Sequence, residues 1–284
     1  MRFGAHVSAA GGLELAPERA GELNLEVFQF FSRPPQGGRV GPISQETAKK
    51  FRAACEKHGF DTCYVHAPFI INLASSEERI RSSSVDILRQ ELERSSRLGA
   101  KALMFHPGSA AKVGEAVGEK LVIAGVRNIL KGYRGTARFL IEISAGAGAV
   151  VADRFEEVRR LLDGVNDDRL AVCFDTAHAF ASGYDLRTAK AVKETMGEFD
   201  RVVGFDRLLL SHCNDSKVEL GARKDRHEAI GRGHIGRAGF RALLAHPRFS
   251  KLDLILETEP EGWKKDLNTL RSLRPSATKR RRSS

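Results

Sequence analysis

The stretch Leu170-Ala171-Val172-Cys173-Phe174-Asp175-Thr176-Ala177-His178 places a carboxylate and then an imidazole directly after a short apolar run. An apolar run of this length, bounded by polar residues, is typical of a β-strand rather than of a helix. We therefore interpret residues 170–175 as a strand. Asp175 closes it, and His178 lies just beyond its carboxyl end.

Seven further runs of this kind occur along the chain, and amphipathic segments with helical spacing separate them. The other predicted strands are residues 2–7, 26–31, 63–66, 102–106, 139–142, 208–212 and 254–257, and clear helical segments are 77–98, 114–130, 154–162 and 186–199. Eight such β/α units in about 270 residues predict a TIM (β/α)8 barrel. An open doubly wound sheet is the alternative, but no Gly-rich dinucleotide fingerprint follows the first run.

We expect residues 1–274 to form a single catalytic barrel domain. Residues 275–284 contain Lys279-Arg280-Arg281-Arg282 among small polar residues, and this composition predicts a basic, disordered tail.

The composition excludes several classes of protein. The chain has 284 residues, and its 42% hydrophobic content is enough for a large core, so bulk disorder is excluded. No run approaches the 18 to 20 apolar residues of a membrane span, and the four cysteines form no Cys-x-x-Cys pair. We expect a cytoplasmic monomer without membrane association. The formal net charge of +10 favours a polyanionic partner such as nucleic acid.

Side chains that commonly bind metals close six consecutive predicted strands, from the third to the eighth. They are His66, His106, Glu142, Asp175, His212 and Glu257. Because the carboxyl ends of all strands in a (β/α)8 barrel meet at one rim, we expect these side chains to lie together there. A single residue of this kind is more often a hydrogen-bonded rim residue than a ligand, but six in register indicate a metal site.

Two loops add three more candidates: His178 after the sixth strand, and Asp225 and His227 in the long loop after the seventh. Nine ligands are too many for one ion and suit two or three. His6, at the end of the first strand, is expected to line the site without binding a metal. We interpret Cys173 and Cys213 as core residues, and His58 and His246 as surface residues of helices.

Several segments resemble the endonuclease IV family of apurinic/apyrimidinic endonucleases, in order and over residues 2 to about 272. They are Gly4-Ala5-His6-Val7-Ser8-Ala9-Ala10-Gly11-Gly12, Phe105-His106-Pro107-Gly108-Ser109, Asp175-Thr176-Ala177-His178-Ala179-Phe180, Gly183-Tyr184-Asp185-Leu186-Arg187-Thr188, His212-Cys213-Asn214-Asp215-Ser216-Lys217, Asp225-Arg226-His227 and Leu254-Ile255-Leu256-Glu257-Thr258.

The resemblance implies a TIM barrel with three Zn²⁺ ions that incises double-stranded DNA on the 5′ side of an abasic site. The products would be a 3′-hydroxyl and a 5′-deoxyribose phosphate, and removal of 3′ blocking groups is a further activity to test. By this likeness His66, His106 and Glu142 hold one ion, Glu142 bridges to a second held by Asp175, His212 and Glu257, and His178, Asp225 and His227 hold the third. Glu142 and Glu257 would position the nucleophile. Mn²⁺ or Fe²⁺ also suits such ligands.

The chain departs from the family where the DNA is expected to be penetrated. Family members commonly carry Lys-Asn-x-Arg-x-Trp after the second strand, whereas this chain reads Ser32-Arg33-Pro34-Pro35-Gln36-Gly37-Gly38-Arg39. Gln36 replaces the inserted arginine, so we expect Arg33 or Arg39 to substitute for it. Phe69 stands where tyrosine is frequent and retains a ring that can stack on a base. Arg226 is a further candidate for a DNA contact.

Two other functions remain open at this stage. Glu142, Asp175, His212 and Glu257 alone resemble the tetrad of a single-metal sugar isomerase or epimerase with the same barrel, which would not need the five other ligands. A non-catalytic DNA-binding barrel that keeps its metals only for stability is the second alternative.

Overall fold

The computed structural model describes residues 1–38 and 40–275, and it confirms the predicted (β/α)8 barrel. Eight parallel strands close in the order β1-β10-β7-β6-β5-β4-β3-β2. Their bounds are β1 Arg2–His6, β2 Val27–Phe31, β3 Cys63–His66, β4 Ala102–Phe105, β5 Arg138–Glu142, β6 Leu170–Asp175, β7 Leu208–His212 and β10 Asp253–Leu256.

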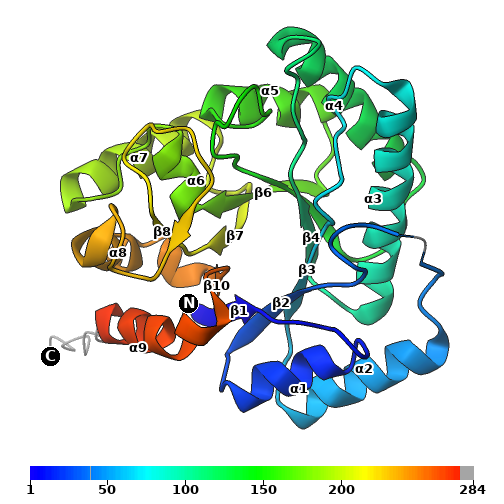
Figure 1. The fold of residues 1–284 in the computed structure, drawn as a ribbon, viewed down its shortest axis with the longest axis horizontal. Helices are drawn as coiled ribbons and strands as arrows, with labels where there is room; N and C mark the ends of the chain where they lie inside the picture. The colour runs from blue at the N-terminus through cyan, green and yellow to red at the C-terminus, as the bar shows by residue number, and fades with distance from the viewer. Residues whose placement is uncertain (39, 276–284) are drawn as a thin grey trace, which may run out of the picture.

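Helices surround the barrel as an outer ring (Figure 1). They are α1 Leu15–Glu22, α2 Gln45–Lys57, α3 Glu78–Leu98, α4 Glu115–Leu130, α5 Phe155–Val165, α6 Thr176–Ala181, α7 Ala189–Val202, α8 Gly236–Ala245 and α9 Trp263–Leu273, with short 3₁₀ turns η1 Phe249–Lys251 and η2 Pro260–Gly262. None of the helices in the described residues is long and apolar enough to cross a membrane.

Alternation along each strand divides the core into two parts. Residues of one parity pack between the strands and the helices, in a large cluster that includes Phe3, Phe28 and Phe105. Residues of the other parity point into the barrel and form a second cluster, which comprises Val27, Tyr64, Ala102, Met104, Leu140, Ala171, Cys173, Leu210 and Ile255. The second parity, continued toward the carboxyl end of each strand, reaches the predicted metal ligands.

Two details differ from the sequence-based expectations, and a third expectation is not tested. His106 and Glu257 lie one residue beyond the strands that were predicted to include them. His58 and His246 follow the last residues of α2 and α8 instead of lying within these helices, and both are partly exposed. The basic segment Lys279–Arg282 of the predicted tail lies outside the described residues.

The first strand has no room for a side chain at Gly4. A Cβ atom there would lie 2.0 Å from the backbone oxygen of Val27 and 2.9 Å from Cδ1 of Ile255. Gly4 pairs with Val27 of β2 on one side and with Ile255 of β10 on the other, so neither neighbour can move without opening the sheet.

We therefore expect Gly4→Ala to destabilise the fold by about 3 kcal/mol, because the barrel must shift to accommodate one methyl group. Gly197→Ala is the matched control, since Gly197 lies exposed within α7 and an added Cβ would meet no atom within 4 Å. That control should gain about 0.5–1 kcal/mol from helix propensity. Urea unfolding of both variants tests this, and equal stabilities would contradict it.

Candidate metal centre

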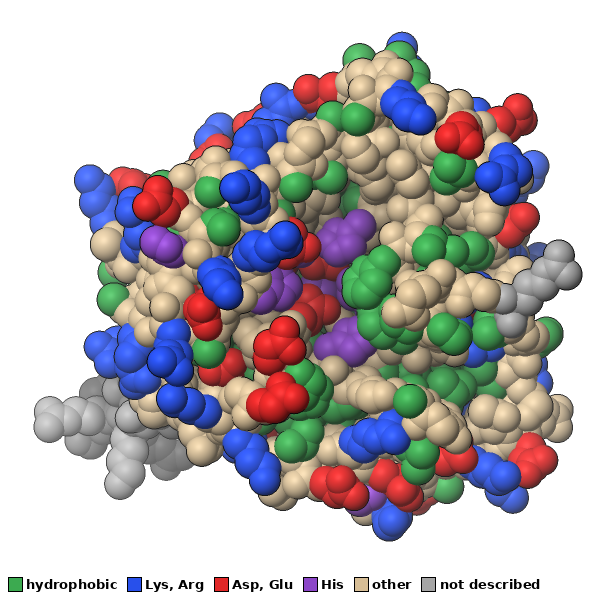
Figure 2. All heavy atoms as spheres, in the orientation of Figure 1, with side chains coloured by type: hydrophobic (Ala, Val, Ile, Leu, Met, Phe, Trp, Pro, Cys, Tyr) green, Lys and Arg blue, Asp and Glu red, His purple; other side chains and the backbone are tan. Residues whose placement is uncertain are grey.

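The predicted ligands converge on one hollow at the carboxyl ends of the strands. The hollow has a volume of about 690 Å³, and His6, His66, His106, His178, His227 and Glu257 contribute to its lining. Figure 2 shows histidine and acidic side chains gathered in this depression. The fold therefore brings ligand-type side chains from segments that are far apart in the sequence to a single rim, as the sequence predicts.

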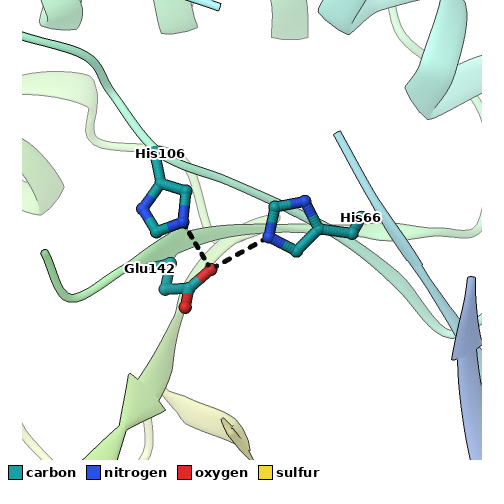
Figure 3. Close-up of side chains that lie close together, drawn as sticks. All are labelled: His66, His106 and Glu142. Atoms are coloured by element: carbon teal, nitrogen blue, oxygen red, sulfur yellow. Dashed lines mark hydrogen bonds and ion pairs between the residues drawn. The ribbon is translucent and has the colours of Figure 1, made fainter. Parts of the chain in front are cut away.

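The first group joins β3, the end of β4 and β5. His66 Nε2 and His106 Nε2 each lie 3.3 Å from the same oxygen, Oε2 of Glu142, and the two rings point at it from neighbouring strands (Figure 3). Nδ1 of His66 donates to the carbonyl oxygen of Ala67 at 2.6 Å. That hydrogen bond fixes the ring and leaves Nε2 available as a metal ligand.

The second group shares Glu142 with the first. Nδ1 of His212 lies 2.7 Å from Oε1 of Glu142, 3.0 Å from Oε2 of Glu257 and 3.9 Å from Oδ2 of Asp175. Glu142 thus presents one oxygen to each group. This is the geometry expected of a carboxylate that bridges two cations.

The third group forms around α6 and the loop that carries Asp225. Oδ1 of Asp225 lies 3.2 Å from Nε2 of His178 and 3.4 Å from Nε2 of His227. Asp175 also approaches, with Oδ2 3.8 Å from Nε2 of His227. The resemblance implied only His178, Asp225 and His227 here, so the structure adds Asp175 as a neighbour of both the second and third groups.

A small two-stranded sheet holds His227 at the rim. It pairs β8 (Asp215–Ser216) with β9 (His227–Glu228) in antiparallel fashion. The buried carboxylate of Asp215 accepts hydrogen bonds from the backbone amides of Gly231, Gly233 and Ile235, which fixes the chain that follows β9. The sequence analysis assigned no role to Asp215.

Sequence reasoning also missed Asn214, although it quoted the segment that contains it. Asn214 is fully buried, and its Nδ2 donates to Oδ2 of Asp175 at 2.7 Å while its Oδ1 accepts from the backbone amide of Glu257 at 2.8 Å. The asparagine therefore links two predicted ligands of the second group. No regular spacing marks such a residue, because it acts from a loop and not from a strand end.

The charges of the groups are mutually dependent. Burial opposes ionisation of Glu142, but the surrounding His106, His212 and His178 more than offset it and hold the pKa of this carboxyl well below its usual value. Burial likewise opposes protonation of His178, but Asp175, Asp225 and Glu142 raise its pKa well above the ordinary value. Carboxylates and imidazoles whose donor atoms lie within 4.8 Å of one another fit divalent cations, which supply the positive charge that such a buried set requires.

A fourth group consists of carboxylates alone, lies away from the rim on α4 and α5, and is paired with arginines. Glu115 and Glu119 on α4 and Glu157 on α5 approach one another. Arg160 donates to both oxygens of Glu119, at 2.8 and 2.5 Å, and Arg154 pairs with Glu115. The arginines supply the countercharge here, so this group does not resemble the rim groups.

The raised pKa of the Glu157 carboxyl makes the free energy of unfolding depend on pH. Burial raises the pKa of this carboxyl from about 4.5 to about 7, although the backbone amides of Ala152 and Asp153 donate to it. Between these values the folded chain binds more protons than the unfolded chain, so stability falls as the pH rises from about 4.5 to about 7. We expect Glu157→Gln to be about 2 kcal/mol more stable than the wild type at pH 8 and nearly equal to it at pH 5. Urea unfolding at both pH values measures this, with the exposed Glu156→Gln as control; a difference independent of pH would contradict it.

Of the five expected DNA contacts, one is wrong and one cannot be located. Arg33 is buried and its Nε donates to Oε1 of Glu91 on α3 at 2.7 Å, so it is an internal ion pair and not a DNA ligand. Gln36 and Arg226 are exposed, and Phe69 is 67% exposed beside the hollow. Arg39 lies outside the described residues.

The Arg33–Glu91 pair makes Arg33 a determinant of stability. Its side chain is 2% exposed and that of Glu91 is fully buried, so Arg33→Met would leave the carboxylate with only Ser32 and Arg94 as partners. We expect a loss of about 3 kcal/mol in the free energy of unfolding. Chemical denaturation tests this, and unchanged stability would show that the arginine is not internally paired. Arg52→Met, at an exposed arginine of α2, serves as control.

Comparisons with known proteins show the same fold and a family. A family described as xylose isomerase-like TIM barrel matches residues 17–273. A protein of Halorhodospira halophila named probable endonuclease 4 is 40% identical over 95% of this chain and 92% of its own length. The crystal structure of endonuclease IV from Thermus thermophilus superposes with a TM-score of 0.86 and 35% identity, over 96% of this chain and 98% of that one.

A D-tagatose 3-epimerase-like protein also superposes, with a TM-score of 0.74 over 96% of this chain and 97% of its own, but at 19% identity this likeness shows the fold alone. The extended identity to endonuclease 4 proteins carries more weight, because it spans the strands and the loops that hold the rim residues. The chain therefore belongs to the endonuclease IV family and, with it, to the xylose isomerase-like TIM barrels.

Proposed function

We propose that this chain is a metal-dependent DNA repair endonuclease that hydrolyses the phosphodiester bond 5′ to an abasic site in duplex DNA. The products are a 3′-hydroxyl and a 5′-deoxyribose phosphate. The observation that carries the proposal is the convergence of nine ligand-type side chains at one rim, in a chain of the endonuclease IV family.

Three Zn²⁺ ions would occupy the three groups. His66, His106 and Glu142 would hold the first; Glu142, Asp175, His212 and Glu257 the second; and His178, Asp225 and His227 the third. The contacts of the ring nitrogens support this assignment, because His66 and His178 each engage a backbone carbonyl through Nδ1 and present Nε2 to carboxylate oxygens. Mn²⁺ or Fe²⁺ would accept the same ligands.

When bound, divalent ions would supply a hydroxide nucleophile near neutral pH and would neutralise the charge that develops on the phosphate oxygens. The protein positions that chemistry. Glu142 is fully buried among the histidines and cannot move without losing several contacts. Glu257 is 15% exposed and borders the hollow, so it is the ligand of the second group that faces an incoming phosphate.

The mouth of the hollow offers an apolar contact for DNA. Phe69 is 67% exposed, and its ring packs edge-on against Phe31 with 5.3 Å between the ring centroids. The backbone amide of Phe69 donates to the carbonyl oxygen of Pro35, which ties this segment to the loop that carries the exposed Gln36. Phe69 can therefore stack on a base while Gln36 and Arg226 offer polar contacts, and the net charge of +10 favours the phosphate backbone.

The test is incision of a duplex that contains one reduced abasic analogue, which cannot undergo β-elimination. We expect the wild type to cleave 5′ to the lesion and Glu257→Gln to lose at least about 100-fold in rate, because a ligand that orients the nucleophile is altered. Glu261→Gln is the matched control, since this exposed carboxylate in η2 does not line the hollow. Products are resolved on a denaturing gel.

Metal removal completes the experiment. A chelator should abolish incision, and added Zn²⁺ should restore it. If the fully metal-loaded wild type does not incise this duplex, the proposed endonuclease activity is refuted. Tight, salt-dependent duplex binding without turnover would then indicate a DNA-binding barrel, and isomerisation of a free sugar would indicate the epimerase alternative.

A further inference from the structure

A buried glutamine lies among the proposed ligands without belonging to any of them. Gln29 is in the middle of β2, is fully buried, and points into the barrel with the same parity as Val27. Its amide contacts three residues from other strands, namely His6 of β1, His212 of β7 and Glu257 after β10. Such a polar side chain in a barrel interior is costly unless every contact is satisfied.

The contact with Glu257 determines which way the amide faces. A carboxylate oxygen only accepts hydrogen bonds, and Oε1 of Glu257 lies 2.7 Å from Nε2 of Gln29, so the amide NH₂ faces this residue. The amide oxygen of Gln29 must therefore face His212. Oε1 of Gln29 lies 2.8 Å from Nε2 of His212, and an oxygen that only accepts requires that this ring nitrogen carry the proton.

The tautomer of His212 follows from this arrangement. With the proton on Nε2, the ring offers Nδ1 to the second metal group, where it lies 2.7 Å from Oε1 of Glu142 and 3.0 Å from Oε2 of Glu257. In the other tautomer, Nε2 would offer a lone pair to the amide oxygen and Nδ1 would carry a hydrogen toward the metal. Gln29 disfavours that tautomer.

A third contact fixes the amide itself. The second hydrogen on Nε2 of Gln29 points to Nδ1 of His6 at 2.9 Å, and the ring of His6 packs against Phe31 with 4.3 Å between the ring centroids. His6 thus accepts from Gln29, and it belongs to none of the ligand groups among the described residues. Rotation of the amide would break all three hydrogen bonds together.

We propose that Gln29 is a positioning residue of the second metal group. It holds His212 as the Nε2-protonated tautomer with Nδ1 directed at the metal, and it holds Oε1 of Glu257 so that Oε2 faces the same point. This inference rests on the proposed metal centre. It assigns to the β2 strand, which supplies none of the nine ligands, the task of orienting two of them.

The test compares Gln29→Met, which keeps the volume and removes all three hydrogen bonds, with the wild type. We expect the variant to bind one of its metal ions about 10- to 100-fold more weakly, because partners that orient ligands contribute on this scale. Metal content is measured by mass spectrometry after dialysis against graded concentrations of a competing chelator. Long-range ¹H–¹⁵N NMR of histidine-labelled protein reports the proton on Nε2 of His212.

Two further variants separate positioning from general loss of packing. Tyr64→Phe removes another buried hydrogen bond inside the barrel, from the Tyr64 hydroxyl to Oδ2 of Asp253 at the amino-terminal start of β10. It should lower the Tm without changing metal affinity. Gln29→Glu retains an acceptor for Nε2 of His212 but places a second carboxylate against Glu257, so the His212 signal should persist while metal affinity falls.

The outcomes are distinguishable. A wild type that binds no metal ions would overturn the metal centre and this inference together. A wild type that binds them, with Gln29→Met unchanged in both metal affinity and the His212 signal, would overturn only the role of Gln29. If Gln29→Met fails to fold, Gln29→Glu decides: wild-type metal affinity in that variant would refute the proposed contact with Glu257.

Discussion

The period of two along a β-strand, imposed on a closed barrel, is the constraint on which the rest of the structure depends. Every second residue must point inward, and apolar side chains fill most of the interior below the strand ends, with the buried Gln29 of β2 as a polar exception. The last inward positions at the carboxyl ends of the strands then lie in or just beneath the same hollow. His66, Glu142 and Asp175 occupy such positions, so segments that are far apart in the sequence supply one polar site from the ends of their strands.

Because of that constraint, several charged side chains lie close together and buried at the rim, and their charges must be compensated. Fully buried carboxylates such as Glu142 and Asp175 lose hydration, and only charged or hydrogen-bonding neighbours can compensate them. The histidines compensate part of this lost hydration, and divalent cations would supply the positive charge that is still required. The polar residues just behind the ligands follow the same logic: Asn214 satisfies Asp175, and Gln29 satisfies Glu257 and His212. The site is thus a continuous hydrogen-bonded layer in which the predicted ligands and the polar residues behind them are largely buried together.

The loop after β2 differs in sequence from the segment that is common in the family, and its contacts show what replaces that segment. Arg33 points inward and pairs with Glu91 of α3. Arg94, also of α3, donates to the carbonyl oxygens of Ser32 and Gly41, so these hydrogen bonds attach the loop to α3. The resemblance suggested that an arginine from this segment would enter the DNA, and burial excludes Arg33 from that role. Among the described residues of this loop and of the segment after β3, Gln36 and Phe69 are exposed, and both differ in chemistry from an inserted guanidinium group.

The sequence by itself determined the eight strands of the barrel and the ligand-type residues that close six of them, because strand periodicity and a polar residue at a strand end are local features that need no knowledge of neighbours. The tertiary structure alone decided which residues meet. A glutamine at position 29 or an asparagine at 214 has no local signature, and its role arises only when the barrel closes and brings Glu257, His212 and Asp175 within hydrogen-bonding distance. Likewise, Arg33 looks like a free cation in the sequence, and only the packing of α3 against the β2 loop shows that its charge is already neutralised by Glu91.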